Sequence, residues 1–498
     1  MRANRRGRIL YLRSGILLAI LVAFIFYWCS DSLSQSGSRN QSATKAGSKA
    51  DAAIVTELRQ AADLLQSGNL DEAEPILRRI LQANPENADA HNLLGIVLDR
   101  RDKTTAAERE YRTALRLNPN GMSAMANLGV LLARTGRADE AIKTFESVLR
   151  SAPDHPQATI NLGLQYAARG DDARAISLLQ RAAALGFDNY EVQYHLGVSL
   201  YNLKRFDEAS AALDSALKLS PDAADPYYYL GLIEWANNHD DRAANLWDRA
   251  VTLRVNFPAA YFMLGEALRK NKRIQASVDF YKRALDQDPS QFAYYARLGG
   301  VYIALGQPDR ALEIFRRAVM RFPDLPEAHY FAGIAARAQA DYDTAEKELR
   351  KSLALDPKNV NTLAQLGFVL LERNQTIEAE TILRQAVAIN DKHFYANYDL
   401  GRLLVKSHRY EQALPILEHA AGLKPNNPGV HYQLFMTLSR LKRKDEADRE
   451  LVIFKQLDEA RKSRPRSDGE IEDEDVQNPP AAPPSNPQAN ASEPAVQH

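Results

Sequence analysis

The side chains that most often carry catalysis or bind metals form no recognisable pattern in this chain. Its ten histidines do not pair at metal-ligand spacing, and its single cysteine, Cys29, excludes an internal disulfide and a cysteine-rich zinc site. The sequence holds no Walker-type phosphate loop, Gly-x-Gly-x-x-Gly, Gly-x-Ser-x-Gly or His-Glu-x-x-His motif. Lys plus Arg and Asp plus Glu number 63 each, which argues against a dedicated nucleic-acid binder. We therefore expect no enzyme activity, no cofactor and no metal, and look for function in protein binding.

Ten glycines recur at a constant interval of 34 residues, and we call them the glycine ladder. They are Gly95, Gly129, Gly163, Gly197, Gly231, Gly265, Gly299, Gly333, Gly367 and Gly401. A strict period of this length is typical of stacked repeats. Glycine inside a helix costs about 1 kcal/mol relative to alanine, so ten cost about as much as the net stability of a domain. Such a cost is tolerable where the missing side chain lets two helices approach closely. We interpret the ladder as packing contacts without a functional role.

The residues between the glycines follow the same 34-residue period. With glycine at position 8, the unit 88–121 has these residues at fixed positions: Leu94 at 7, Leu98 at 11, Ala107 at 20, Tyr111 at 24, Ala114 at 27 and Pro119 at 32. This pattern resembles the tetratricopeptide repeat. The resemblance covers residues 54–461 and implies an all-α fold, a right-handed superhelical solenoid of about twelve 34-residue helix-turn-helix repeats.

Details within the repeats support this interpretation. Six repeats have a residue suited to positive φ between their two helices: Gly68, Gly136, Gly170, Asn238, Gly306 and Asn374. Three histidines share position 4, which favours helix packing over metal binding: His91, His329 and His431. The first repeat has Ala61 in place of the ladder glycine and the last has Phe435, as expected for the ends of a stacked array.

The resemblance also indicates a binding surface. In the tetratricopeptide family, positions 2, 5, 6, 9, 12 and 13 of the first helix line the concave face. In this chain the candidates there are Tyr194, Tyr201, Tyr228, Tyr229, Trp235 and Phe262 in repeats five to seven, with Tyr330 in repeat nine. Aromatic side chains in a groove are good anchors for an extended peptide or an amphipathic helix. Plain repeat packing is the alternative. Tyr201 and Trp235 are the strongest candidates because position 12 faces outward from the stack.

Charged residues occupy the same predicted surface. Glu266, Arg269 and Lys270 belong to repeat seven, Arg297 to repeat eight and Arg337 to repeat nine. These side chains could meet an acidic partner segment or a carboxy-terminus. The spacing that the family uses for a two-carboxylate clamp is absent from any three consecutive repeats.

The N-terminus predicts attachment to a membrane. Residues 2–13 contain five arginines and no acid, and residues 14–30 carry no charge. Seventeen helical residues reach about 26 Å, enough for a spanning helix. The arginine excess places the N-terminus in the cytoplasm and the repeats on the other side, in the periplasm if the protein belongs to a bacterial envelope. A cleaved signal peptide is the alternative.

The domain organisation follows from these features. We predict a cytoplasmic stub and anchor at residues 1–30, a flexible linker at 31–53, twelve repeats at 54–461 and a disordered tail at 462–498. The tail contains an acidic run from Asp468 to Asp475, which is either a solvated segment or an electrostatic docking segment.

The predicted function is that of a membrane-anchored scaffold that binds a protein or peptide in its groove, in envelope assembly or secretion. Two alternatives remain. One is an accessory or degenerate relative of the glycosyltransferases that carry a similar array, although no catalytic domain follows here and only Asn127 and Asn161 match their asparagine pattern. The other is a structural spacer.

Overall fold

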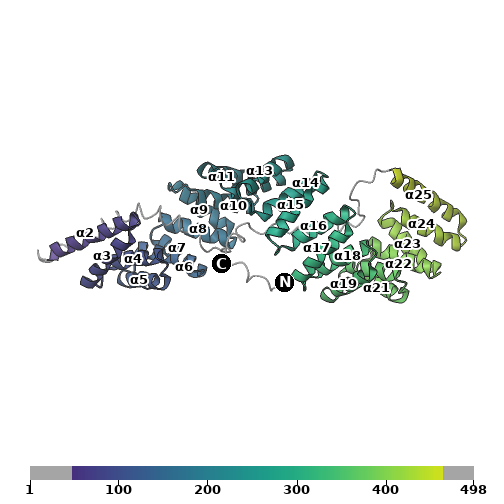
Figure 1. The fold of residues 1–498 in the computed structure, drawn as a ribbon, viewed down its shortest axis with the longest axis horizontal. Coiled ribbons are helices and arrows are strands. Elements are labelled where there is room, and N and C mark those ends of the chain that lie inside the picture. The colour runs from purple at the N-terminus through teal and green to yellow at the C-terminus, as the bar shows by residue number, and fades with distance from the viewer. Residues whose placement is uncertain (1–46, 464–498) are drawn as a thin grey trace. The chain divides into compact units, whose positions relative to one another are not determined.

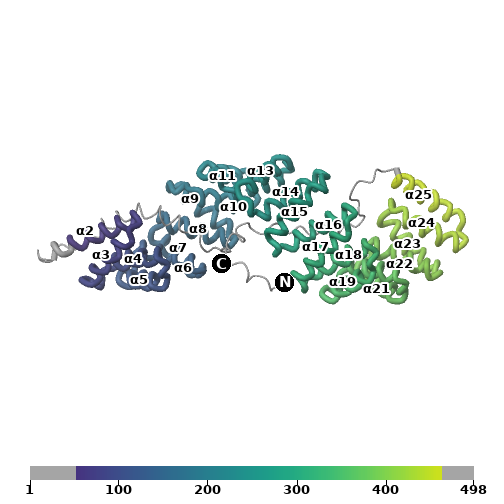
Figure 2. Tube along the Cα trace, viewed as in Figure 1, coloured from purple at the N-terminus to yellow at the C-terminus, as the bar shows by residue number. Residues whose placement is uncertain are grey.

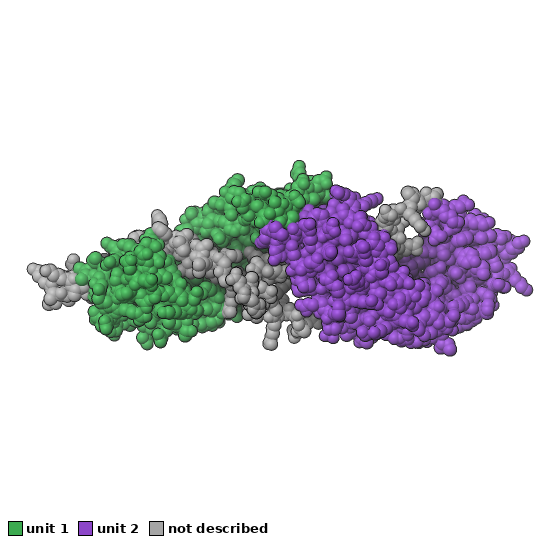
Figure 3. All heavy atoms as spheres, in the orientation of Figure 1, with its two compact units in different colours: residues 1–253, 485–498 green, residues 254–484 purple. Residues whose placement is uncertain are grey.

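The computed structural model describes residues 47–463, and all the regular secondary structure in that range is helical. It consists of 24 helices, α2 to α25, without a strand (Figure 1). Within the described range the helices fall into two compact units (Figure 3). The first unit ends at Leu253 and the second begins at Arg254. We call them the N-terminal and the C-terminal unit and describe each by itself.

The N-terminal unit contains twelve helices. They are α2 (Gly47–Gln66), α3 (Leu70–Ala83), α4 (Ala88–Arg100), α5 (Thr104–Leu117), α6 (Met122–Arg134), α7 (Ala138–Ser151), α8 (Pro156–Arg169), α9 (Asp172–Ala184), α10 (Tyr190–Asn202), α11 (Phe206–Leu219), α12 (Ala224–Ala236) and α13 (Asp240–Leu253).

The C-terminal unit contains twelve more. They are α14 (Pro258–Lys270), α15 (Ile274–Gln287), α16 (Phe292–Ala304), α17 (Pro308–Arg321), α18 (Pro326–Ala338), α19 (Tyr342–Leu355), α20 (Val360–Glu372), α21 (Thr376–Ile389), α22 (Phe394–Lys406), α23 (Tyr410–Leu423), α24 (Pro428–Arg440) and α25 (Lys444–Ser463).

Consecutive helices pair as hairpins, one hairpin to each predicted repeat (Figure 2). We call the even-numbered helix of a hairpin its A helix and the odd-numbered one its B helix. Each A helix also contacts the B helix of the preceding hairpin within its unit. The prediction of an all-α array of helix-turn-helix repeats is confirmed for the described residues.

The glycine ladder lies where the two helices of each hairpin touch. A Cβ atom added at Gly95 would lie 2.5 Å from the Tyr111 ring, and one at Gly299 would lie 2.2 Å from the Phe315 ring. Every other ladder glycine faces the side chain sixteen residues later in the same way. Position 20 brings small side chains to the same contact, since Ala107 and Ala311 are fully buried. The packing interpretation of the ladder is therefore confirmed.

The turn inside every hairpin contains one residue with positive φ, at position 15 of the repeat. The six predicted positions adopt it, including Gly68 and Asn374. Six further residues adopt it without being glycine or asparagine: Asp102, Lys204, Lys272, Ala340, His408 and Lys442. The backbone bonds that close the turn are the same in these repeats; for example, the Lys103 amide donates to the Leu98 carbonyl at 2.9 Å. Packing of the two helices imposes this turn even on residues that disfavour it.

The three position-4 histidines join neighbouring repeats, which agrees with their predicted packing role. Nδ1 of His329 lies 2.6 Å from the Glu348 carboxylate on the B helix of its own repeat, and Nε2 lies 3.0 Å from the Pro323 carbonyl at the end of the preceding repeat. His91 and His431 make the same two contacts. We call this arrangement the histidine latch.

Helix α2 begins at Gly47, inside the stretch assigned to the linker from sequence. The residues after it include alanines and other good helix formers, which extend the first A helix toward the N-terminus. Between residues 47 and 463, no helix combines the length and apolar character that crossing a membrane requires. The predicted anchor at residues 1–30 and most of the tail lie outside the described residues.

Candidate functional site

The predicted aromatic residues of the N-terminal unit meet on the A helices α10 and α12. The Tyr229 ring is central, with its centroid 5.5 Å from that of Tyr201, 5.5 Å from that of Tyr228 and 6.1 Å from that of Tyr194. Trp235 packs against Trp247 of the partner B helix at 5.7 Å. The structure therefore brings four of the five predicted residues into one ring cluster. The fifth, Trp235, lies on α12 together with Tyr228 and Tyr229.

Burial divides this cluster into core and surface. Tyr194, Tyr228 and Tyr229 retain only 3%, 1% and 5% of their accessible surface, so they are core residues and not exposed groove anchors. Positions 5 and 6 of an A helix pack against the adjacent repeat, which is why sequence alone could not separate packing from recognition there. Tyr201 and Trp235, both at position 12, remain partly exposed. A role in partner contact stays a prediction. Of the five aromatic residues, Tyr201 and Trp235 are the two with exposed surface for such a contact.

Two aliphatic side chains complete the exposed surface. Val198 and Leu232 lie one turn before Tyr201 and Trp235, at position 9, and are also partly exposed. Residues three apart are neighbours on a helix surface. The four side chains therefore form two equivalent apolar pairs, one on α10 and one on α12. We call them the aromatic strip.

Two ionisable side chains beside or within the strip, His195 and Tyr201, are uncharged at physiological pH. Burial lowers the pKa of His195 to about 4, so this ring, which packs on Tyr194, is neutral at physiological pH. Burial also raises the pKa of the Tyr201 phenol, which keeps its proton. Asn202 donates to the Asp172 carboxylate at 3.2 Å. The strip is thus suited to an apolar ligand surface with a few hydrogen-bonding groups.

The predicted aromatic residues of the C-terminal unit are core residues. Phe262 is 4% exposed and packs between Tyr281 and Tyr294, with ring centroids 5.6 and 5.1 Å away. Tyr330 is 7% exposed and packs edge-on against Phe331. The structure gives neither residue the exposed surface of a groove anchor.

Two of the predicted charged residues of this unit, Arg269 and Arg297, gather around the carboxylate of a third, Glu266. Glu266 of α14 lies 2.9 Å from Nε of Arg297 on α16 and 3.1 Å from Nη2 of Arg269, one turn further along α14. The Tyr281 hydroxyl of α15 donates to the same carboxylate at 2.6 Å. We call Arg269 and Arg297 the arginine pair.

A second charged cluster lies further along the same unit and contains the predicted Arg337 together with residues that sequence reasoning missed, Phe368, Asp399 and Arg402. The guanidinium groups of Arg337 and Arg402 stand 5.1 and 5.7 Å from the Phe368 ring. Arg402 also pairs with Asp399 at 2.8 Å. Burial raises the pKa of the Asp399 carboxyl to about 6, although Arg402 opposes this shift. The only indication in the sequence was that Phe368 and Arg402 share position 9 of consecutive repeats.

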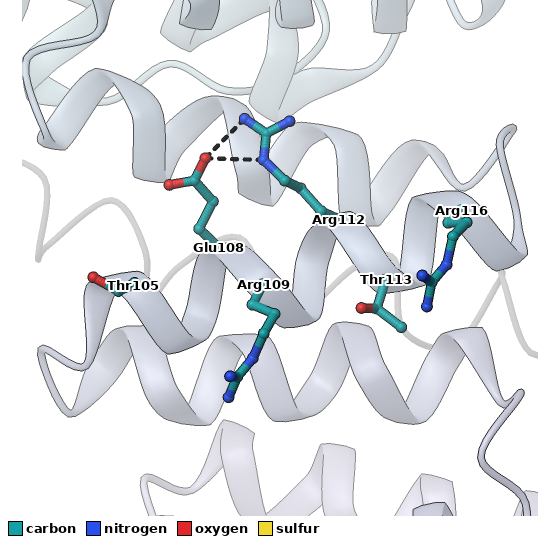
Figure 4. A pocket seen from close by; sticks show the side chains of 6 residues that line it. All are labelled: Thr105, Glu108, Arg109, Arg112, Thr113 and Arg116. Carbon is teal, nitrogen blue, oxygen red and sulfur yellow. Dashed lines mark hydrogen bonds and ion pairs between the residues drawn. The ribbon is translucent and has the colours of Figure 1, made fainter.

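Surface depressions occur on the N-terminal unit, one on a single B helix and two around helices α8 and α9. One of about 420 Å³ is lined by α5 alone, through Thr105, Glu108, Arg109, Arg112, Thr113 and Arg116 (Figure 4). Glu108 accepts two bonds from Arg112, and Figure 4 shows both side chains on the same side of α5. A depression bounded by one helix cannot enclose a cofactor. Within residues 47–463 no cluster of three His, Cys, Asp or Glu side chains could hold a metal ion.

Comparison with protein families gives two matches, which together run from residue 58 to 472. The tetratricopeptide repeat model matches residues 58–121, 95–156, 127–192 and 194–253. The model of the cilia and flagella-associated protein 70 C-terminal domain matches residues 248–472. Among curated proteins, the rat (Rattus norvegicus) FK506-binding protein-like is 37% identical over 70 residues, which is 14% of this chain. The chain spans about a fifth of the length of that relative.

Solved structures that are similar to this chain include the following three. Yeast Tom70 is 15% identical with a TM-score of 0.34, covering 79% of this chain and 97% of the Tom70 chain. The APC/C hetero-tetramer Cut9-Hcn1 is 15% identical with a TM-score of 0.42, covering 81% and 94%. MamA is 27% identical with a TM-score of 0.30, covering 32% and 94%.

The family match and the structure agree on the repeating element. The matched segments run from within α2 to the end of α13, and the C-terminal unit repeats the same hairpin with the same ladder contacts. Residues 58–253 therefore match the tetratricopeptide repeat in sequence and form its helical hairpins, and the described residues form a scaffold of tetratricopeptide type, an architecture suited to protein–protein interaction.

Proposed function

We propose that the chain is a membrane-anchored adaptor whose aromatic strip captures a segment of a partner protein. One observation carries the proposal. Tyr194, Tyr228 and Tyr229 of α10 and α12 are buried, whereas Tyr201 and Trp235 stay partly exposed at the same position of consecutive repeats, each beside an aliphatic neighbour. Exposed tryptophan and tyrosine next to a packed core are typical of interface hot spots.

The strip favours a partner segment with apolar side chains at regular spacing. Two equivalent pairs, Val198 with Tyr201 and Leu232 with Trp235, offer two successive apolar contacts. An amphipathic helix presents such contacts at intervals of three or four residues, and an extended strand presents them at intervals of two. Neutral His195 next to the cluster adds no charge that would have to be desolvated on binding.

The anchoring part of the proposal rests on the sequence of residues 1–30. The arginines before an uncharged stretch support a single span with a cytoplasmic N-terminus and exported repeats. In this setting the adaptor would act in the assembly or secretion machinery of a bacterial envelope, with the repeats in the periplasm.

A photo-crosslinking experiment in cells tests both parts. Benzoylphenylalanine replaces Trp235 in one variant and Tyr227 in a control, since Tyr227 belongs to the same helix and lies partly exposed at position 4. We expect one defined adduct from position 235, found in the membrane fraction, and none from position 227. Equal labelling at both positions, or none at either, would support a structural spacer instead. A soluble adduct would contradict the anchor.

Mutation of the strip then measures how much these side chains contribute to the free energy of partner binding. With the partner identified from the adduct, we expect Tyr201→Ala combined with Trp235→Ala to weaken binding at least about 30-fold, the loss typical of a hot spot. Tyr227→Ala should leave the affinity within about twofold of the unaltered protein. Circular dichroism checks that the double variant keeps its helices. Unchanged affinity of the double variant would assign partner binding to another surface.

A further inference from the structure

The arginine pair of the C-terminal unit has more positive charge than its surroundings balance. Among the described residues, Glu266 is the one carboxylate that faces both guanidinium groups, through Nε of Arg297 at 2.9 Å and Nη2 of Arg269 at 3.1 Å. The third contact to this carboxylate comes from the neutral Tyr281 hydroxyl. Two cations therefore share one anion, and the cluster keeps a net charge of about +1 in a site that is mostly shielded from water.

Hydrogen bonding at the arginine pair is also incomplete. The Arg297 side chain is 7% exposed, and its Nη1 is buried without a hydrogen-bond acceptor among the described residues. The Nε of Arg269 is also buried without a hydrogen-bond acceptor among the described residues. Burial lowers the pKa of Arg297, and the nearby Glu266 carboxylate opposes this shift. Buried donors of charged groups are normally satisfied in folded proteins.

A ligand can approach this site through Arg269. Its side chain is 32% exposed at the C-terminal end of α14. The turn that follows adds Lys272 and Arg273, and residues 258–325 hold eleven Lys and Arg against seven Asp and Glu. The chemistry that fits is a carboxylate, which takes bidentate bonds from guanidinium and is attracted by the surrounding positive charge.

The chain itself contains a segment of matching chemistry. Residues 468–475 include six carboxylates and no basic residue, the densest acidic run in the sequence. The run begins five residues after α25 ends at Ser463. Twelve residues of extended chain from the end of α25 to Asp475 reach up to about 40 Å.

We propose that the arginine pair is a carboxylate-binding site and that the chain's own acidic segment, Asp468–Asp475, occupies it. An Asp or Glu side chain of the segment accepts a hydrogen bond from the Arg269 guanidinium group. Together with Glu266 it gives the two guanidinium groups two negative charges. This site is separate from the aromatic strip and does not depend on the function proposed for it.

The experiment uses the full-length protein and a fluorescein-labelled peptide of residues 467–476. In the tail-neutral variant, the six acids of the run are replaced by Asn or Gln, which alters no described residue. We expect this variant to bind the peptide about tenfold more tightly than the unaltered chain, because a tethered competitor with millimolar effective concentration has been removed. Adding Arg269→Gln should abolish that binding, whereas Lys282→Gln, an exposed charge on the B helix of the same repeat, should not.

Zero-length carbodiimide crosslinking locates the segment directly. We expect mass spectrometry to find Lys272 joined to a carboxylate of residues 468–475 in the unaltered chain, with the yield reduced by Arg269→Gln. Equal peptide affinity with and without the acidic run, or crosslinks confined to other lysines, would overturn the proposal. Mixed isotope-labelled and unlabelled chains complete the test, since crosslinks between the two labels would assign the segment to a second copy and overturn docking within one chain.

Discussion

At the scale of single residues, the ladder glycines make a close contact that no larger side chain can replace. A Cβ at Gly299 would lie 2.2 Å from the Phe315 ring, which is itself fully buried and unable to retreat. Overpacking of this kind typically costs 1–3 kcal/mol, about 1 kcal/mol of which is regained through the better helix propensity of alanine. The ladder glycines are therefore required by packing at each hairpin.

We predict that Gly299→Ala lowers the free energy of unfolding by about 1–2 kcal/mol. Gly422→Ala is the matched control, because Gly422 lies inside helix α23 of the same unit with no atom within 4 Å of the added Cβ. The control should raise stability by up to about 1 kcal/mol. Urea denaturation followed by circular dichroism measures both. Equal effects of the two substitutions would disprove the contact as the reason for the ladder.

Asp399 provides a pH-dependent contribution at the same scale. Its carboxyl has a pKa of about 6 in the folded chain against an ordinary value of 3.8, chiefly because it is buried. The folded state therefore holds a proton that the unfolded state has lost between pH 4 and pH 6. Protonation of Asp399 therefore adds up to about 3 kcal/mol to the free energy of unfolding. This contribution is fully present below pH 4 and is lost as the pH rises through 6.

We predict that Asp399→Asn flattens the change in stability between pH 4 and pH 6 relative to the unaltered chain. The amide keeps the shape of the side chain but does not titrate. Asp324→Asn, at an exposed aspartate in the turn before α18, should leave the pH profile unchanged. Urea midpoints measured from pH 4 to 7 distinguish the two variants. Parallel profiles for Asp399→Asn and the unaltered chain would refute the assignment.

At the scale of elements, the histidine latch joins a B helix, an A helix and the turn before it. His329 on α18 binds Glu348 of α19 and the Pro323 carbonyl that follows α17, so one ring connects three segments of two repeats. Its removal leaves Glu348, with a side chain only 12% exposed, paired with Lys351 at 3.6 Å. The latch thus fixes the register between repeats eight and nine.

We predict that His329→Phe lowers the free energy of unfolding by about 2 kcal/mol, the typical cost of leaving a partly buried carboxylate poorly paired. Hydrogen exchange should rise first at the end of α17 and the start of α18. His419→Phe is the control, because His419 is exposed and makes one bond to the Asp391 carbonyl. Its effect should stay within about 0.5 kcal/mol. Similar losses for both variants would show that the latch adds nothing specific.

At the scale of the whole molecule, contacts are made between neighbouring repeats, so local changes stay local. The aromatic strip belongs to the N-terminal unit and the arginine pair to the C-terminal unit. One chain therefore offers two surfaces of different chemistry, one apolar and one cationic. Replacement of Arg269 by Gln is expected to change binding of the acidic peptide while crosslinking from position 235 in cells stays the same.

The sequence alone determined the repeat, its period and its frame. A strict 34-residue spacing of glycine, alanine and proline can be met only by identical helix contacts repeated along the chain, so the fold class and the packing role of Gly95 or Ala107 followed from the pattern. Half of the hairpin turns also followed, at Gly68, Asn238 and similar residues. The other turns did not, since Ala340 or Lys272 adopts positive φ only because the packed helices impose it.

Tertiary structure decided which side chains remain available for binding. Tyr194, Tyr228, Tyr229, Phe262 and Tyr330 occupy predicted groove positions, yet contacts with the adjacent repeat bury them. Tyr201 and Trp235, both at position 12, also pack against another ring but keep part of their surface exposed. The sharing of Glu266 by Arg269 and Arg297 likewise depends on how α14 and α16 stack. A repeat pattern fixes where each residue stands along its helix, but the neighbouring repeat determines how much of that residue water can reach.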